Sequence, residues 1–224
     1  MLSAIAVIPA APVLVPALAG AAAAELADLR AAVFTAAAAL PARWVALGAG
    51  PTAAVFDADA TGTFAGFGVG VPVRLSPLAN RPADLPLCAL IAGWVRGQVR
   101  PEAQVRVQVY DDTEAAVVGG VQLRAEVEHS PEPVGVLVLA DGANTLTAAA
   151  PGGHRPGDAA VQRSLDDALS HGDTTVLTQL PPQVVGRAGY AALAGLAGRG
   201  PRTARQLYCA APYGVGYFAG IWQP

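Results

Sequence analysis

The sequence predicts an α/β fold, a three-layer sandwich in which helices flank a mostly parallel central sheet. Short apolar runs alternate along the chain with longer helical segments, as in strands that are joined by crossover helices. One of these runs, 134–139, is apolar throughout, which is typical of a strand buried on both faces of a parallel sheet. A length of 224 residues favours a single domain covering 1–224.

The first half of the chain predicts two buried strands separated by a long helix. Pro9 ends the first apolar run, and Pro41 ends an Ala-rich stretch that is helical by composition. The expected elements are, in order, a strand at 4–8, a helix at 17–40, a strand at 44–47 running into a Gly-rich turn, a loop at 57–70 with a short hairpin around 69–73, and an amphipathic helix at 85–99.

The second half opens on a strand with one wetter face, because apolar and polar residues alternate at 105–109. The elements expected after it are a helix from Asp112 or Thr113 to Val127, the strand 134–139, helices at 159–170 and 182–197, and closing strands at 206–210 and 217–222. The segment 213–222 is rich in aromatic residues and Gly, and we interpret it as a contact surface for a partner.

Composition and charge exclude several classes of protein. A hydrophobic content of 53% with a net charge of −3 excludes an intrinsically disordered chain. The 14 basic residues are all Arg and form no stripe of the breadth that nucleic acid requires. Residues 1–24 carry no charge, but Pro9, Pro12 and Pro16 interrupt them, so they predict neither a membrane span nor a signal peptide. We expect a cytoplasmic protein that binds neither nucleic acid nor membrane, with secretion as the alternative.

Ligands of open α/β sheets bind beyond the carboxyl ends of the strands, which here are the loops after residues 8, 47, 109 and 139. These loops carry few reactive groups, and the chain has neither a Gly-x-Ser-x-Gly nucleophile elbow nor a P-loop. We interpret the acids at 111, 112 and 114 as caps of the following helix. The densest polar group, Asp141, Asn144, Thr145 and Thr147, suits a turn-capping network and a binding site equally well.

Metal and thiol chemistry have little support in the sequence. The three histidines, His129, His154 and His171, show no metal-ligand spacing. Cys88 and Cys209 each lie inside an apolar run, which predicts buried, reduced thiols.

The segment 6–16 (Ala-Val-Ile-Pro-Ala-Ala-Pro-Val-Leu-Val-Pro) resembles the opening of class III extradiol ring-cleavage dioxygenases, in their B-type subunit, where the loop after the first strand typically reads Pro-His-Pro-Pro. Further similarities are the Leu-Gly-Ala-Gly-Pro turn at 47–51, the Asp-Gly pair at 141–142, the Ala-Pro-Gly loop at 150–152 and the ending at 211–218. The last two are similar to a small subgroup of uncharacterised relatives. The resemblance covers nearly the whole chain and implies the α/β fold of that extradiol dioxygenase family.

The resemblance also implies a metal site whose residues this chain lacks. Members of the family hold a non-haem Fe(II) through two His and one Glu, and a further His acts as acid and base. On this sequence the first His falls at Ala10, the second in the turn Ala49-Gly50-Pro51, and the acid/base His at Asn144-Thr145, while no Glu follows Glu132. The chain is therefore expected to hold no metal and no cofactor, with Fe(II) only if the family activity is kept.

Our leading hypothesis is a non-catalytic binding or interaction protein, a pseudoenzyme that forms a homo-oligomer or binds another protein chain, with a small-molecule ligand as a further option. The alternatives are a non-haem iron dioxygenase, and another chemistry in the same cleft that uses Asp141, Asn144 and His154. The residues expected to line the cleft are Ala10, Gly50, Asp141, Asn144, Thr145, His154 and Tyr213. Convergence of these side chains in one cavity would favour an enzyme, and scattered positions would favour a scaffold.

Overall fold

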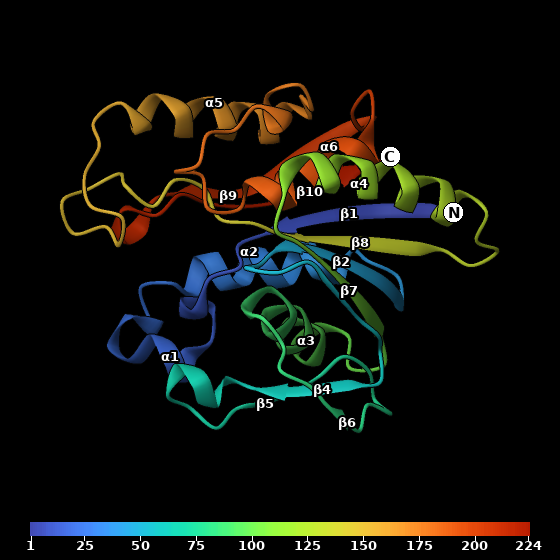
Figure 1. Ribbon diagram of the computed structural model, residues 1–224. Helices are drawn as coiled ribbons and strands as arrows, with labels where there is room; N and C mark the ends of the chain where they lie inside the picture. The colour runs from blue at the N-terminus through green and yellow to red at the C-terminus, as the bar shows by residue number, and fades with distance from the viewer.

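The computed structural model describes residues 1–224 and contains a seven-stranded sheet between two layers of helices (Figure 1). The order of the strands across the sheet is β3-β7-β2-β8-β1-β10-β9. Their bounds are β1 (Leu2–Ile8), β2 (Arg43–Ala49), β3 (Ala54–Phe56), β7 (Gln104–Tyr110), β8 (Val134–Leu139), β9 (Thr203–Ala210) and β10 (Tyr217–Gln223).

The sheet is mixed rather than mostly parallel. The four neighbouring strands β7, β2, β8 and β1 are parallel to one another, whereas β3 pairs antiparallel with β7, β10 with β1, and β9 with β10. The loop 211–216 is too short to hold a crossover helix, so β9 and β10 must run antiparallel. The α/β fold is confirmed, and the parallel arrangement is confined to the centre of the sheet.

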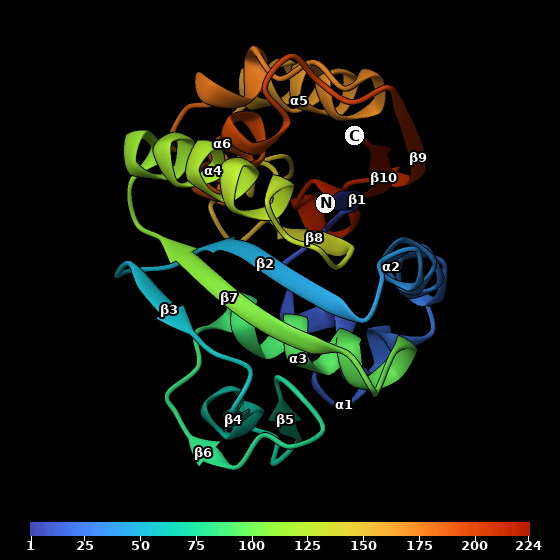
Figure 2. The same ribbon diagram turned by 90° about the vertical axis from the view of Figure 1, so that its right-hand side faces the viewer.

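Helices cover both faces of the sheet (Figures 1 and 2). The upper layer holds α4 (Thr113–Glu128), α5 (Asp158–His171) and α6 (Arg187–Ala197). The lower layer holds α1 (Pro16–Ala19), α2 (Ala27–Ala38) and α3 (Leu87–Val99), together with a small sheet of β4 (Ala60–Thr63), β5 (Pro72–Arg74) and β6 (Arg81–Pro82). Short 3-10 helices lie at η1 (Pro12–Leu14), η2 (Gly20–Ala23), η3 (Phe64–Phe67), η4 (Val176–Thr178) and η5 (Pro212–Gly214). None of the helices combines the length and the apolar character that crossing a membrane requires.

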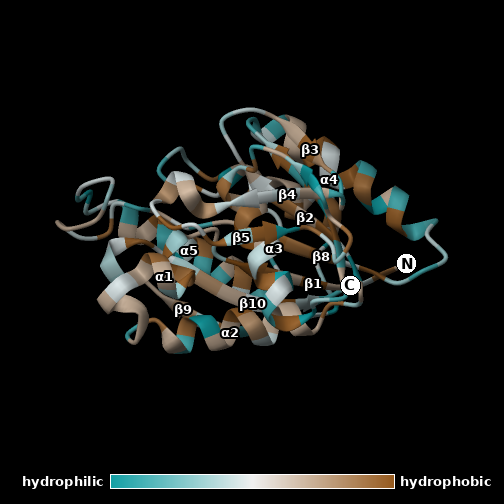
Figure 3. Ribbon diagram, turned by 90° about the horizontal axis from the view of Figure 1, so that it is seen from below, coloured by the Kyte–Doolittle hydropathy of each residue, from teal (hydrophilic) through white to brown (hydrophobic).

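Each face of the sheet carries its own apolar core. Successive strand residues point to opposite faces, so Leu137 and Leu139 of β8 pack below the sheet while Val136 and Val138 pack above it. Trp44 anchors the lower core, and Trp222 anchors the upper core. The central strands are therefore apolar on both faces, as the hydropathy colours in Figure 3 show.

Two predicted helices are shorter than expected. The helix predicted at 17–40 breaks because Gly20 adopts φ 55° and ends α1, and α2 begins only at Ala27. The helix predicted at 182–197 begins at Arg187, since Val185 instead donates its backbone N–H to Gly142 in the loop after β8.

Two further expectations about the chain are corrected. The short strand β3 has no counterpart in the prediction, and the residues around 69–73 contribute only the second strand of a hairpin with β4. Most of the segment 213–222 is interior strand and not a contact surface, because Tyr217, Phe218 and Trp222 are 5%, 2% and 0% exposed.

The helices α4 and α6 touch through glycine. A Cβ atom built on Gly120 of α4 would lie 2.1 Å from the carbonyl oxygen of Ala192, and one on Gly195 of α6 would lie 2.1 Å from that of Val117. No Cβ atom fits at either distance, so the upper layer requires glycine at both positions.

We expect Gly120→Ala to lower the free energy of unfolding by about 1–3 kcal/mol, because overpacking forces the two helices apart. The matched control is Gly97→Ala in α3, where a Cβ would have no neighbour within 4 Å. That substitution is expected to leave stability unchanged or to raise it by up to about 1 kcal/mol, as alanine does in an exposed helix. Urea unfolding of both variants measures the difference, and equal effects would contradict the close contact.

Candidate functional site

The four parallel strands all end at the same edge of the sheet, which we call the carboxyl end of the sheet. Two hydrogen bonds join its loops in pairs. The backbone N–H of Ala10, after β1, donates to Asp141 Oδ1, after β8, over 2.9 Å. The N–H of Gly50, after β2, donates to the carbonyl of Tyr110, the last residue of β7, over 3.0 Å. The loops after β1 and β8 therefore lie side by side, as do the turn after β2 and the end of β7.

The loop that carries Asp141 is fixed from several sides. Gly142 donates its N–H to the Gly216 carbonyl over 2.8 Å, and Gly186 donates to the Asp141 carbonyl over 2.8 Å. The Tyr190 hydroxyl of α6 donates to the Ala140 carbonyl over 2.9 Å. The side chain of Asp141 therefore projects from a rigid backbone.

The buried Gln162 of α5 explains the glycines of this loop. Its Oε1 accepts the N–H of Ala143 over 2.8 Å. A Cβ on Gly142 or Gly216 would lie 2.2 Å or 2.3 Å from atoms of Gln162. Glycine at both positions allows the two loops to close over this side chain.

Asp141 is a partly buried carboxyl group with no cationic partner. Burial removes water from around the carboxyl group of Asp141 and raises its pKa to about 7. The hydrogen bond from Ala10 lowers the pKa, but by less than burial raises it. No arginine or histidine contributes to its pKa. A carboxyl group in this state is ionised and protonated in comparable amounts at neutral pH.

Tyr217 at the start of β10 lies beside Asp141. Burial raises the pKa of its phenol strongly, and the nearby Asp141 carboxylate and the phenols of Tyr208 and Tyr213 raise it further. Tyr217 was not among the residues predicted to line the cleft. Its only signal was its place in the closing strand, because nothing in the local sequence shows that β10 pairs with β1.

Thr145 belongs to a turn network through its side chain, and Asn144 joins it through its backbone carbonyl. The Thr145 hydroxyl donates to Asp158 Oδ2 over 2.5 Å, and Gln183 Nε2 donates to the other oxygen of Asp158 over 3.0 Å. The Asn144 carbonyl accepts the N–H of Gly152 over 2.9 Å. Of the two interpretations of this polar group, the turn network describes Thr145 and the backbone of Asn144, and a binding site at Asp141 stays a prediction.

The other predicted cleft residues do not converge on Asp141 with functional side chains. His154 is exposed in the loop before α5. Tyr213 is 43% exposed, has φ 59°, and donates its hydroxyl to Glu25 Oε2 over 2.5 Å. A Cβ on Gly50 would lie 2.5 Å from Val109 Cγ1, so this position serves packing.

The remaining candidate groups have structural roles. Asp112 caps α4 by accepting the N–H of Ala115 over 2.8 Å, as predicted. Cys88 is buried against Gly48, and desolvation raises the pKa of its thiol to about 11. Cys209 is only partly buried, contrary to the prediction, because it lies on β9, an edge strand of the sheet.

The residues at the carboxyl end of the sheet do not fit the Fe(II) ion that the family resemblance implies. Ala10 has no ligating atom in its side chain, and its amide donates to Asp141. Nowhere do three or more His, Cys, Asp or Glu side chains lie close enough together to hold a metal ion.

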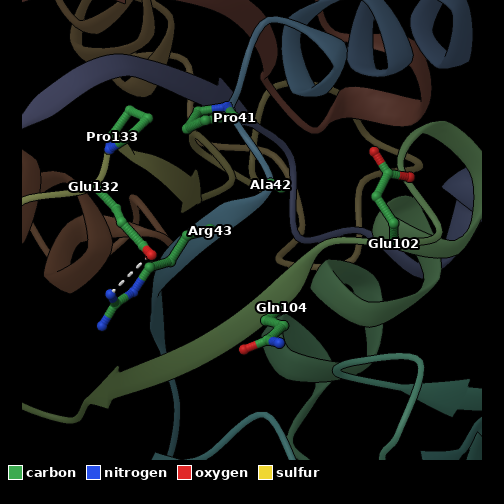
Figure 4. A pocket seen from close by; sticks show the side chains of 7 residues that line it. All are labelled: Pro41, Ala42, Arg43, Glu102, Gln104, Glu132 and Pro133. Atoms are coloured by element: carbon green, nitrogen blue, oxygen red, sulfur yellow. Dashed lines mark hydrogen bonds and ion pairs between the residues drawn. The ribbon is translucent and has the colours of Figure 1, made fainter.

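Two hollows of the surface lie away from Asp141. A depression of about 600 Å³ at the opposite end of the sheet is lined by Pro41, Ala42, Arg43, Glu102, Gln104, Glu132 and Pro133. Figure 4 shows Arg43 and Glu132 turned toward each other over 3.4 Å, with Glu102 set apart from them. A groove of about 650 Å³ between β3, β7 and α4 includes the exposed Val55 and Val118, but nothing in the structure shows what covers it.

The fold recurs in a solved structure. The crystal structure of the uncharacterized protein JW3007 from Escherichia coli K12 matches 98% of this chain and 99% of its own, with a TM-score of 0.57 and 11% identity. No family model matches the chain, and no curated protein does. At this identity the similarity shows a shared fold alone.

The raised pKa of Asp141 predicts a pH-dependent gain in stability for Asp141→Asn. Between the unfolded pKa of about 3.9 and the folded value of about 7, the folded chain binds more protons than the unfolded chain, so rising pH destabilises it. Asn cannot ionise and still accepts the Ala10 N–H. The unfolding free energy of D141N relative to wild type should therefore increase from pH 5 to pH 8 in urea titrations.

The control for this prediction is Asp59→Asn. The guanidinium of Arg81, bonded over 2.8 and 2.9 Å, lowers the pKa of Asp59. The relative stability of D59N should show no increase between pH 5 and pH 8. A pH profile for D141N that matches that of D59N would contradict the environment described for Asp141.

Proposed function

We propose that the protein is a metal-independent, non-catalytic binding protein on a fold similar to that of the class III extradiol dioxygenases. The hydrogen bond from Ala10 to Asp141 carries the proposal. It occupies the junction of the β1 and β8 loops, where the resemblance would place the first iron ligand, with a backbone amide and a single carboxylate. An amide N–H repels a cation, and one carboxylate does not hold Fe(II).

The enzyme alternative loses its support because its residues are scattered. Asp141 lies at the carboxyl end of the sheet, Asn144 lies in a turn against Gly152, and His154 is exposed in the loop before α5. Joint acid and base catalysis by these three residues would require them within hydrogen-bond reach of one substrate. A binding role requires only the free groups around Asp141.

The position of Asp141 supports binding of a small molecule. Open α/β sheets bind ligands beyond the carboxyl ends of their strands. Asp141 and Tyr217 are polar side chains beside the loop that carries Ala10, and backbone hydrogen bonds hold the loop of Asp141 in position. Self-association, or association with another protein chain, stays a prediction.

Anaerobic reconstitution with Fe(II), followed by desalting and metal analysis, tests the proposal. We expect far less than one iron per chain and no ring cleavage of catechol, protocatechuate or another catechol when oxygen is admitted. An active extradiol dioxygenase treated in parallel controls the procedure. Stoichiometric iron, or cleavage of any of these catechols, would overturn the proposal.

A further inference from the structure

We propose that the carboxyl end of the sheet binds a small organic cation, a protonated amine on an apolar or aromatic body, between the carboxylate of Asp141 and the hydroxyl of Tyr217. The inference rests on the proposed function, because an iron ion at this place would compete for the same carboxylate.

Strand order brings the two side chains to one place. β8 and β10 pair with opposite sides of β1, so the loop after β8 and the start of β10 flank the loop that carries Ala10. Side chains two residues apart on a strand share a face. Tyr217 belongs to the lower core with Leu139 and Ala219. Backbone hydrogen bonds from Gly142 to Gly216 and from Gly216 to Ala143, over 2.8 and 2.9 Å, hold the loop of Asp141 beside the start of β10.

Both side chains keep an oxygen atom free for a ligand. The Ala10 amide occupies only Oδ1 of Asp141, and no hydrogen bond occupies Asp141 Oδ2 or the hydroxyl of Tyr217, although Tyr217 is only 5% exposed. The fully buried polar side-chain atoms without a partner are all arginine nitrogens, on Arg30, Arg100 and Arg106. The two free oxygens are therefore accessible to solvent.

The charge of the surroundings selects a cation. Asp141 has no arginine or histidine beside it, and the charged group that acts on Tyr217 is the carboxylate of Asp141. Beyond them, Glu25 accepts the hydroxyl of Tyr213, and Asp28 acts on Tyr208. Burial of a carboxylate without a positively charged partner costs free energy. A cationic ligand that binds beside it supplies that partner and is therefore favoured.

The tyrosines favour an organic cation over a metal ion. Phenol rings attract ammonium groups through their faces, and they pack against an apolar body. Ca²⁺ and transition metals require more oxygen or nitrogen ligands than this place supplies. An anionic ligand would meet a carboxylate at close range.

The test uses 2-phenylethylamine, with 2-phenylethanol and 3-phenylpropionate as neutral and anionic analogues of similar size. Calorimetric titration of the full chain at pH 8 is expected to show one amine bound per chain, with both analogues at least about tenfold weaker. Asp141→Asn should weaken amine binding at least about tenfold, since it removes the charge and keeps the shape. Tyr217→Phe should weaken it severalfold through loss of one hydrogen bond.

The matched control is Asp112→Asn. It removes the same charge at the same end of the sheet, and Asn still caps α4 in place of Asp112. Amine binding by D112N is expected to equal that of wild type. Thermal unfolding of all three variants shows that each is folded before its affinity is compared.

The pH dependence provides a second readout. The titratable groups that act on Asp141 are Tyr190 on α6 and Tyr217 on β10, and burial raises the pKa of both phenols, so they stay protonated between pH 6 and pH 8. Ionisation of Asp141 should therefore raise the affinity for the amine about tenfold across this range.

Absence of amine binding, equal affinity for the alcohol, or unchanged binding by D141N would each overturn the cation site. These failures leave the proposed function standing, because it fails only if iron binds or a catechol is cleaved.

Discussion

The hydrogen bond that Ala10 donates to Asp141 ties the loop after β1 to the loop after β8, near the centre of the seven-stranded sheet. It uses a backbone amide in the place where the family resemblance implies a metal-binding imidazole. An amide supplies a hydrogen bond but no charge, so the carboxyl group is held in position and left without a counter-ion. The carboxyl end of the sheet therefore carries a negatively charged group that is held in a fixed position and has no positively charged partner.

Small residues make that geometry possible. Gly142 and Gly216 lie against Gln162, and Gly186 lies against Ala140 so closely that a Cβ would be 2.6 Å from its side chain. The absence of a side chain at Gly120 likewise lets α4 pack directly against α6. Fifty alanines and 25 glycines in 224 residues therefore allow backbone to approach backbone on both faces of the sheet.

The features that the sequence predicts correctly are those that a short segment determines by itself. The apolar run of β8, the alternation in β7 and the capping acid Asp112 are properties of short segments, and each was recognisable in the sequence. The break at Gly20 could not be predicted, because the residues around it are mostly alanine, which favours a continuous helix. Asp141 was identified as a candidate, but Tyr217 joins it only through the pairing of β10 with β1, and Asp158 of α5 draws Thr145 into a turn network. Such long-range contacts leave no local signal.

The state of the Asp141 carboxyl group is the central point of this account, and a carbon-13 NMR titration of its carboxyl carbon measures that state directly. The account predicts a midpoint near pH 7, because the group is partly buried, receives one amide hydrogen bond and has no cationic neighbour. A midpoint near 4, the ordinary value for aspartate, would show that water or an opposite charge reaches this carboxyl group, and would contradict the site described at the carboxyl end of the sheet.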